Sequence, residues 1–414
     1  MKINFLRNFT LIIIMLLTVN VYAETITQNN LSEQELTTIK QDLHKVISDT
    51  QQQFNLIGLS ASVLLPNQQM PLTLTTGKSL IDDGKPITPA SLFQIGSITK
   101  TFTAVIAARA INEKYLSLDD NLGKFFPEYP QWKNITIGEL LNQTSGIFDY
   151  IDSKDWWHNL FISGDKIWDA KSLVNIAYQY PVKFPAGTNW AYSNTNYVLL
   201  GLILEKVTHK SMDDLMLQLI QNANLHRTYY LPKKIPENIV QQMAHGYGFY
   251  DTTYDMTTQN GSIWHAAAAI ISSPEDVTYW IHTLFATNLI NGLPITHYLR
   301  LKSPKDGKDI TTINQTGYDF GLFRMNTPEG MVWFTTGFTS GYISGMVYAP
   351  CTNLYFAYSI NKAPVKGLHE FIMMHILHAM NNNKAYQKLI HENSQLPAYC
   401  SHNEPAKKFI FPLQ

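Results

Sequence analysis

Strand-like segments lie near both ends of this 414-residue chain, and a long helical stretch separates them. Near the N-terminus, strands are predicted at 58–65 and 72–76, joined by a turn at Pro66 and Asn67. Near the C-terminus, strands are predicted at 320–325, 330–335, 341–349 and 354–360. We therefore expect a sheet region at about 50–120 and 265–385, with a helical insert at about 121–264.

Apolar periodicity and capping residues predict the helices. They are expected at about 33–53, 97–114, 168–180, 196–207, 273–285 and 364–380. Thr136 and Glu139 form a capping box that opens a further short helix. Residues 229–262 are polar and rich in tyrosine, which predicts a long loop region.

Positive and negative charges are nearly balanced, with a formal net charge of -1 and 15% charged residues. This balance argues against a nucleic-acid partner and against an acidic membrane surface as a partner. The length allows one large domain or two modest ones with a sizeable core.

The first 23 residues have the pattern of a signal peptide. Lys2 and Arg7 give a positive start, 9–19 is apolar, and 21–23 resembles a cleavage site. We expect the mature chain to begin at Glu24, to be periplasmic or secreted, and to make no stable membrane insertion. An uncleaved membrane anchor is the alternative, although the apolar run is short for a bilayer span.

The chain has two cysteines, Cys351 and Cys400. An exported protein can keep a disulfide, and a bridge here would hold the C-terminal tail against the body. Two unrelated thiols are the alternative. Neither cysteine lies in a motif of a nucleophile or a metal ligand.

A serine and a lysine lie three residues apart at the start of a predicted helix. In the stretch Phe-Gln-Ile-Gly-Ser97-Ile-Thr-Lys100 the two side chains are one turn apart on the same face. Serine needs a neighbouring base to become a nucleophile, and this spacing brings an amine within reach of the hydroxyl. Ser163 and Lys166 have the same spacing, so spacing alone does not establish catalysis. Gly96 and the long Ala-rich helix distinguish the first pair.

A second candidate is Tyr192-Ser193-Asn194, which follows a Pro-Ala-Gly loop. A phenol relays protons when a nearby cation lowers its pKa. An Asn side chain both donates and accepts hydrogen bonds. A capping turn before the next helix explains the same residues.

A third candidate comes at the end of a predicted strand. It consists of Thr335, Thr336, Gly337 and Phe338, followed by Thr-Ser-Gly. A small residue and a glycine at a strand edge let a ligand backbone pair with the strand. A backbone N–H here, together with that of Ser97, would supply oxyanion donors. A Gly-rich hairpin is an equal alternative.

These three motifs in this order resemble the serine penicillin-recognising family. The branch is that of class C β-lactamases, D-alanyl-D-alanine carboxypeptidases and related esterases. Supporting stretches are 140–147, 185–194 and 272–276. The resemblance covers about 50–380 and implies an α+β fold, in which helices flank an antiparallel sheet and an all-helical subdomain is inserted. The hydrolase domain would span 24–385, followed by a tail at 386–414.

The resemblance also implies roles for the motif residues. Ser97 would attack a carbonyl and form an acyl-enzyme. Lys100 would take the serine proton, or would hold Tyr192 as a phenolate, and the two would titrate as a coupled pair. Tyr192 would pass a proton to the leaving group and later activate water. Asn194 would hold the amide of the acyl side chain, and the N–H groups of Ser97 and Phe338 would form the oxyanion hole.

Position 335 departs from the family pattern. The third motif of the family usually begins with Lys or His, whereas this chain has Thr335 followed by Thr336 and Gly337. Losing a charge-assisted hydrogen bond of this kind costs roughly 1.5–3 kcal/mol. This weakens the case for a substrate with a free carboxylate, and a hydroxyl suits a neutral ester or amide equally well. Arg324 on a neighbouring predicted strand is a candidate substitute for the cation.

Neither a metal nor an organic cofactor is expected. His369, His375 and His378 share the last predicted helix, but histidines on a helix are more often surface or core residues than ligands. A Gly-x-Ser-x-Gly elbow is missing from the sequence, which argues against an α/β-hydrolase.

The sequence therefore predicts an exported serine hydrolase that acts on a small-molecule or peptidoglycan-peptide substrate. Within this class a D-Ala-D-Ala carboxypeptidase-like peptidase ranks slightly above an esterase, and both rank above an efficient β-lactamase. A non-catalytic member that binds cell-wall peptides or a protein partner is the alternative from another class. The intact Ser97, Lys100, Tyr192 and Asn194 argue against it, and Thr335 argues for it.

Overall fold

The computed structural model describes residues 31–393 and Cys400, apart from 67, 69, 83, 155, 157–165, 249–250, 260 and 311–314. The predicted signal peptide at 1–23 and Ser163 lie outside the described residues. Within the described part, no helix has the length and apolar character needed to cross a membrane.

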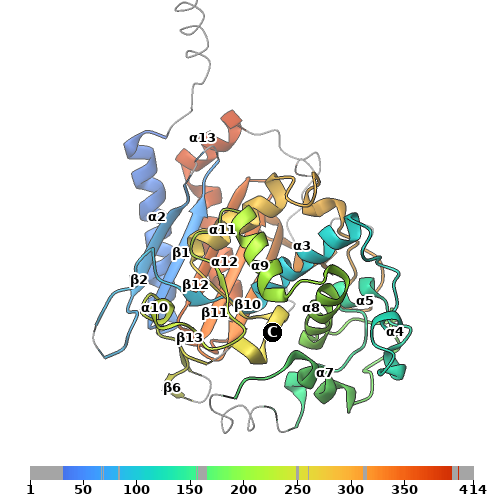
Figure 1. Cartoon of the computed structure of the whole chain (residues 1–414). Coiled ribbons are helices and arrows are strands. Elements are labelled where there is room, and N and C mark those ends of the chain that lie inside the picture. Colours follow the sequence, from blue (N-terminus) through green and yellow to red (C-terminus); the bar gives the residue numbers. More distant parts are fainter. Residues whose placement is uncertain are drawn as a thin grey trace, which may run out of the picture.

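A seven-stranded sheet with antiparallel strand pairs forms the centre of the molecule (Figure 1). Its order is β2-β1-β12-β11-β10-β9-β8. The strands are β1 (Gly58–Leu64), β2 (Leu72–Gly77), β8 (Gly317–Asp319), β9 (Leu322–Thr327), β10 (Gly330–Thr339), β11 (Tyr342–Ala349) and β12 (Leu354–Ile360). Because β1 pairs with β12, with Leu59 opposite Ile360, one sheet joins both ends of the chain. The predicted fold class is confirmed.

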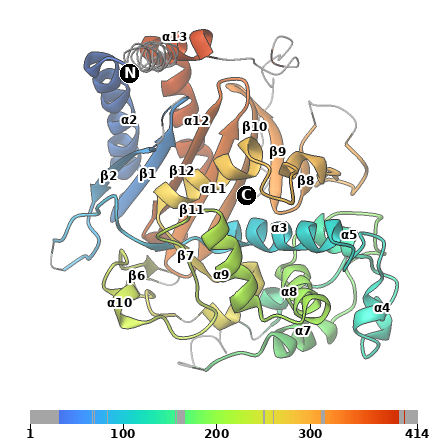
Figure 2. The same cartoon turned by 45° about the horizontal axis from the view of Figure 1, so that its top comes forward.

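Three helices pack on one face of the sheet, and two others separate the opposite face from the helical region. The first group is α2 (Glu33–Gln53), α12 (Leu368–Asn382) and α13 (Lys384–Asn393). Their apolar side chains share one core with the strands. On the other face, α3 (Thr99–Asn112) and α11 (Pro274–Ala286) belong to a second core. Figure 2 shows α11 and α12 on opposite sides of the sheet, with α3 between the sheet and the helical region.

The helical insert supplies most of the second core. Its α-helices are α4 (Leu122–Phe125), α5 (Ile137–Leu141), α7 (Ala170–Tyr178), α8 (Asn194–Thr208), α9 (Met212–Asn222) and α10 (Glu237–Val240). Single 3-10 turns are η1 (Gly96–Ile98), η2 (Pro130–Trp132), η3 (Tyr150–Asp152), η4 (Gly261–Ile263), η5 (His265–Ala267) and η6 (Ile295–His297). α3 is buried along almost its whole length, and its small alanines let α8 and α9 approach closely.

Two small sheets lie outside the central one. In the first, β7 (Ile270–Ser272) pairs with β3 (Phe93–Gln94) and β4 (Tyr229–Tyr230). In the second, β5 (Tyr247–Gly248) lies between β13 (Lys362–Ala363) and β6 (Asp251–Asp255). The segment 229–262 therefore contains short strands and α10, where the sequence predicted only loop.

Several predicted boundaries change in the structure, and three of them bear on the site and the sheet beside it. β10 continues to Thr339, because β11 pairs with it as far as Thr339 opposite Tyr342. The third motif is therefore inside a strand, whereas the sequence placed it at a strand end. The strand predicted at 320–325 begins at Leu322 as β9, because Phe320 and Gly321, with φ of 48° and 81°, form a turn between β8 and β9. α8 begins at Asn194, two residues before its predicted start.

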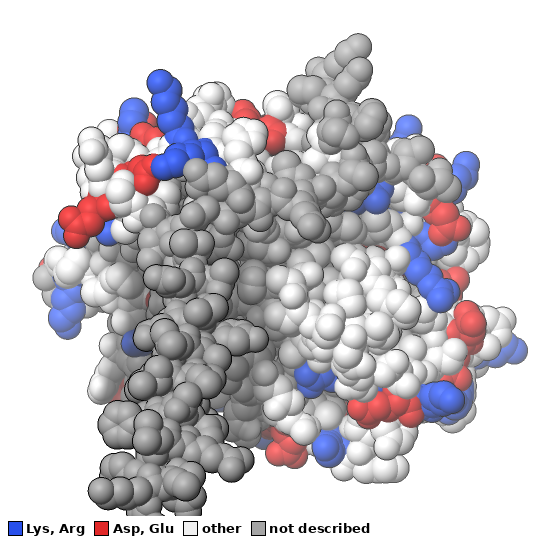
Figure 3. Space-filling model, turned by 90° about the horizontal axis from the view of Figure 1, so that it is seen from above, with Lys and Arg blue, Asp and Glu red and all other residues white. Residues whose placement is uncertain are grey.

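Acidic and basic side chains of the described residues are intermixed on the face shown in Figure 3. This distribution agrees with the formal net charge of -1. A surface of mixed sign does not steer a strongly charged partner over a long distance.

The predicted boundary between domain and tail at residue 385 falls inside α13. Tyr386, Leu389 and Ile390 of α13 are buried in the same core as α2, and Lys388 Nζ lies 2.9 Å from Glu35 Oε1. The body of the domain therefore extends at least through α13.

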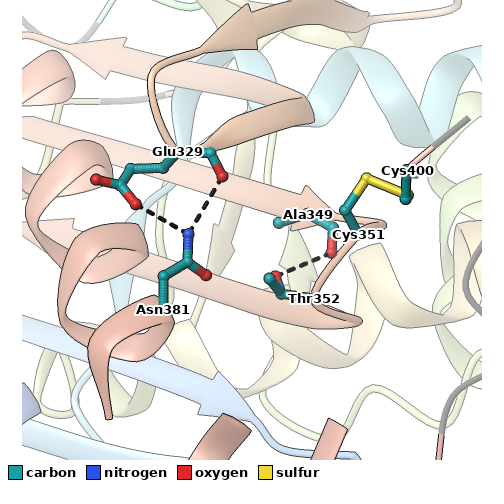
Figure 4. Close-up of a disulfide and its surroundings, with 6 residues drawn as sticks. All are labelled: Glu329, Ala349, Cys351, Thr352, Asn381 and Cys400. Carbon is teal, nitrogen blue, oxygen red and sulfur yellow. Dashed lines mark hydrogen bonds between the residues drawn. A yellow bond between two sulfur atoms is a disulfide. The ribbon is translucent and has the colours of Figure 1, made fainter. Parts of the chain in front are cut away.

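A disulfide joins Cys400 to Cys351 in the turn between β11 and β12 (Figure 4). The same view shows Asn381 of α12 donating to Glu329 Oε2 at 2.9 Å and to Glu329 O at 3.2 Å. The disulfide between Cys351 and Cys400 therefore ties the end of the described chain to the central sheet.

Candidate active site

Ser97 lies in η1, between the short strand β3 and the N-terminus of α3. The residue before it, Gly96, has a φ of +54°, which favours glycine. A Cβ atom at Gly96 would lie 2.5 Å from Phe338 N, so the nucleophile segment packs directly against β10. Ser97 itself is partly exposed.

Lys100 is buried in the first turn of α3, with 1% of its surface exposed. Its Nζ lies 3.0 Å from Ser97 Oγ, 2.7 Å from Asn194 Oδ1 and 3.1 Å from Ala267 O. These three acceptors match the three N–H donors of an ammonium group. Burial lowers the pKa of Lys100 to about 7, whereas the charge of Asp149 raises it. A substantial fraction of the side chain is therefore a neutral amine near pH 7, and the amine can accept the Ser97 proton.

Tyr192 lies beside both Ser97 and Lys100. Lys100 Nζ is 4.8 Å from the centroid of the Tyr192 ring. Burial, followed by the neighbouring Tyr318, raises the pKa of Tyr192 well above its usual value, although a hydrogen bond with Ser97 lowers it. Tyr192 is therefore a neutral phenol near pH 7, which can donate a proton.

Asn194 is the first residue of α8, and its side chain links two buried charged groups. Its Oδ1 faces Lys100, while its backbone N and its Nδ2 donate to Asp149 Oδ2 at 3.0 and 2.9 Å. Asp149 is only 3% exposed, and burial raises its pKa to about 6. Asp149 was not among the predicted site residues. The only signal in the sequence was an acidic residue directly after the Ser-Gly-Ile-Phe stretch.

The third motif brings β10 against the nucleophile segment. Thr335 is 4% exposed and Thr336 is 8% exposed, whereas Phe338 is 36% exposed. A Cβ atom at Gly337 would lie 1.8 Å from Ile95 O, so no other residue fits there without a shift of the backbone. The backbone N–H groups of Ser97 and Phe338 therefore belong to two segments in direct contact.

Arg324, the candidate substitute for the family cation, contacts Trp333 and Gln315. It lies opposite Trp333 in the β9–β10 ladder, its Cζ is 6.0 Å from the Trp333 ring centroid, and it donates to Gln315 O at 3.5 Å. Thr335 is two residues farther along β10, a separation of about 7 Å. These contacts direct Arg324 toward Trp333 and Gln315.

The three histidines of the last predicted helix have three separate partners. His369 Nδ1 lies 2.8 Å from Tyr358 OH, His375 Nδ1 lies 2.8 Å from Phe371 O, and His378 Nδ1 lies 2.8 Å from Glu329 Oε1. Among the described residues, no cluster of three or more His, Cys, Asp or Glu side chains has the arrangement of a metal site.

The contact between β10 and the nucleophile segment predicts the effect of Gly337→Ala. The new methyl group would push β10 away from Ile95, and would take the Phe338 N–H out of position. Loss of one oxyanion donor lowers kcat by roughly 100- to 1,000-fold. We expect a loss of this size in turnover of an activated ester. Gly138→Ala is the matched control, because its Cβ atom would have only ordinary contacts, the nearest at 3.4 Å. Equal activity of both variants would contradict the proposed position of the donor.

Residues 43–377 match the family model described as Beta-lactamase. The chain belongs to the β-lactamase family. The match includes the Ser97 motif, the Tyr192 motif and β10, and it confirms the resemblance that these motifs indicated. The chain is thus a β-lactamase-fold member of the serine hydrolase superfamily.

Two curated proteins similar to the chain are from bacteria. The chain is 28% identical over 251 residues to Protein flp of Staphylococcus aureus (strain N315), which covers 58% of this chain and 48% of that protein. It is 28% identical over 174 residues to Penicillin-binding protein 4* of Bacillus subtilis (strain 168), which covers 41% of this chain and 38% of that protein. The chain therefore spans about half or less of the length of these relatives.

Solved structures show the same fold at low sequence identity. D-amino acid amidase from Ochrobactrum anthropi SV3 has a TM-score of 0.71 and 22% identity, over 84% of this chain and 99% of that one. D-alanine carboxypeptidase AmpC from Burkholderia cenocepacia has a TM-score of 0.66 and 18% identity, over 82% and 99%. A D-stereospecific amidohydrolase from Streptomyces has a TM-score of 0.67 and 24% identity, over 81% and 97%.

Proposed function

We propose that the chain hydrolyses an amide or ester carbonyl through an acyl-Ser97 intermediate. The observation that carries the proposal is the buried Lys100 Nζ, which lies 3.0 Å from Ser97 Oγ and has a pKa lowered to about 7. A nucleophile within hydrogen-bond reach of a base poised near neutral pH is the arrangement that activates a serine.

The geometry supports a definite path for the proton. Neutral Lys100 takes the proton of Ser97 Oγ as the oxygen attacks the carbonyl carbon. The N–H groups of Ser97 and Phe338 hold the developing oxyanion. Tyr192, a neutral phenol, gives its proton to the departing nitrogen or oxygen and recovers one from Lys100. Water then attacks the acyl carbon and gives a proton to neutral Lys100. The bond between Ser97 Oγ and the acyl carbon breaks, and Lys100 returns the proton to Ser97 Oγ. The raised pKa of Tyr192 favours Lys100 as the base of the coupled pair.

We further propose that the preferred substrate has an uncharged leaving group. Position 335 offers a neutral hydroxyl, and Arg324 is directed toward Trp333 and Gln315. Small amides, such as those of D-amino acids, and esters therefore rank above peptides with a free terminal carboxylate. A D-Ala-D-Ala carboxypeptidase-like activity is the second candidate, and D-alanine carboxypeptidase AmpC from Burkholderia cenocepacia shares the fold. Weak β-lactamase activity and a non-catalytic binding role rank below both.

One pair of substrates separates the two leading candidates. A peptide that ends in D-Ala-D-Ala is compared with the same peptide carrying a C-terminal amide, so that only the terminal charge differs. We expect kcat/KM to be at least about tenfold higher for the amide, because the hydroxyl of Thr335 carries no charge that would compensate the desolvation of the carboxylate. A preference for the free carboxylate would instead identify a carboxypeptidase. A chain that hydrolyses neither of the two peptides, and that is also inactive on an activated ester, would contradict the hydrolase proposal.

Thr335→Lys is expected to restore recognition of a carboxylate. A lysine here would regain a charge-assisted hydrogen bond, and penicillin should acylate the variant roughly 10 to 100 times faster than the parent chain. The rate of acylation is followed by intact-mass spectrometry. Thr335→Met is the matched control, since it adds a side chain of similar length without charge. Equal rates for both variants would show that the missing cation is not what limits penicillin recognition.

We also propose that the protein is exported to the periplasm or secreted. The predicted signal peptide at 1–23 and the disulfide between Cys351 and Cys400 support this location. N-terminal sequencing of the mature protein tests it, and the proposal expects Glu24 as the first residue.

A further inference from the structure

We propose that Asp149 is a positioning residue that orients the Asn194 amide toward Lys100 and supplies the buried counter-charge for that lysine. The inference rests on the proposed function, in which Lys100 is the base for Ser97. It also assigns Asn194 a role within the enzyme, as a bridge between two charged groups, in addition to any contact with a substrate.

The orientation of the Asn194 side chain follows from the groups at its two ends. Asp149 Oδ2 accepts both the backbone N–H and the Nδ2–H of Asn194, at 3.0 and 2.9 Å. With Nδ2 toward the carboxylate, Oδ1 faces Lys100 Nζ at 2.7 Å. The flipped amide would place its NH2 group against an ammonium and its oxygen against a carboxylate. Asp149 thereby selects the single orientation in which Asn194 is an acceptor for Lys100.

The loop that carries Asp149 is anchored to the start of α8 by further hydrogen bonds. Tyr150 N donates to Thr195 Oγ1 at 3.1 Å, Ser145 Oγ donates to Asn196 Oδ1 at 2.7 Å, and Ser193 N donates to Gln143 Oε1 at 3.1 Å. This bonding holds the carboxylate in place before any substrate arrives. A fixed acceptor avoids the reorganisation that a mobile group would require during proton transfer.

Asp149 and Lys100 lie in a region where isolated charges are unfavourable. Their exposed fractions are 3% and 1%. A buried ammonium is strongly destabilised unless it is paired and fully hydrogen-bonded. The bridge through Asn194 connects the two charges without direct contact, so Lys100 keeps a position from which it also reaches Ser97.

The other titratable groups around this pair are neutral or face solvent. Tyr150 of η3 and Tyr197 of α8 have pKa values raised well above normal by burial, as Tyr192 does. Burial lowers the pKa of His265 in η5, which favours the neutral ring. Asp152 of η3 is half exposed and lies 3.0 Å from Lys183 Nζ. Among the described residues, Asp149 is thus the buried carboxylate that affects Lys100, and its charge raises the pKa of that lysine.

The direction of the pH effect follows from this arrangement. Lys100 acts as a base only when unprotonated, so the rate of Ser97 acylation rises with pH through the Lys100 pKa. Removing the negative charge of Asp149 lowers this pKa further. In Asp149→Asn the acid limb of the pH–rate profile should move to lower pH by about one unit. An asparagine here keeps an oxygen for the Asn194 N–H groups, so the loop keeps its anchor.

The experiment measures the second-order rate of fluorophosphonate labelling of the full chain between pH 5 and 9. Parent, Asp149→Asn, Asp149→Ala and Asp152→Asn are compared. Asp152→Asn is the matched control, because it removes a nearby half-exposed carboxylate whose charge acts on Asp149 and not on Lys100. Its acid limb should move much less than that of Asp149→Asn. Asp149→Ala should show the shifted limb together with a rate at least about tenfold lower at every pH, because Asn194 loses its anchor.

The possible outcomes separate failure of the proposed function from failure of the role of Asp149. An unlabelled parent chain contradicts the proposed function itself. A labelled parent whose profile is unchanged in Asp149→Asn contradicts the role of Asp149, as does a uniform loss of rate with no shift. If the Asp149 variants do not fold, Asn194→Ala replaces them. It keeps the backbone N–H bond to Asp149 but removes the bridging oxygen, so its acid limb should also move to lower pH. An unshifted limb in this variant overturns the proposal.

Discussion

Ser97→Ala is expected to lower turnover of an activated ester by roughly 10,000-fold or more. No hydroxyl then remains 3.0 Å from Lys100 Nζ, so no acyl-enzyme forms at this position. The measurement is kcat/KM for a p-nitrophenyl ester at pH 8. Because Ser97 is partly exposed, the melting temperature should change by no more than a few degrees.

Ser163→Ala is the matched control for this variant, because Ser163 has the same spacing to a lysine in the sequence. It should keep the activity of the parent chain. Parent-like turnover in Ser97→Ala, or a comparable loss in Ser163→Ala, would contradict the assignment of Ser97 as the nucleophile.

Lys100→Gln is expected to lower kcat/KM by roughly 100- to 10,000-fold, the usual contribution of a general base. The neutral amide keeps donors for nearby acceptors but cannot take the Ser97 proton. The pH profile gives a second readout. With a pKa lowered to about 7, Lys100 is mostly protonated below pH 7, so the parent activity should rise through this range. The rise should be missing in the variant.

Lys166→Gln is the control for the lysine variant. Lys166 Nζ lies 3.7 Å from the centroid of the Trp168 ring, whereas Lys100 is the lysine that bonds Ser97 Oγ, so loss of Lys166 should leave both the rate and the profile unchanged. If the activity of Lys100→Gln still rose with pH near pH 7, the group that titrates in this range would be one other than Lys100.

The fold was predictable from the sequence to the extent that strand signals at both ends imply a sheet shared between them. What could not be predicted depends on partners far away in the chain. β10 extends through Thr339 because β11 offers pairing groups as far as Tyr342. α13 joins the body because Tyr386 and its apolar neighbours find a core next to α2. Neither the length of β10 nor the packing of α13 can be predicted from the pattern of residues along the chain.

The candidate site was predictable where chemistry and spacing coincide in a short motif. Ser97 and Lys100 lie one turn apart, and Tyr192 and Asn194 are two residues apart where α8 begins. Asp149 could not be found in this way, because its bonds to Asn194 join residues 45 positions apart. The state of Lys100 was equally hidden, since its lowered pKa comes from burial, a property of the folded core.

The most direct test of Ser97 as an activated nucleophile is intact-mass spectrometry of the parent chain and of Ser97→Ala after incubation with a fluorophosphonate. We expect a single phosphonyl adduct on the parent, located on Ser97 by peptide mapping, and no adduct on the variant. An unmodified parent chain, or an equal adduct on Ser97→Ala, would contradict the proposed mechanism.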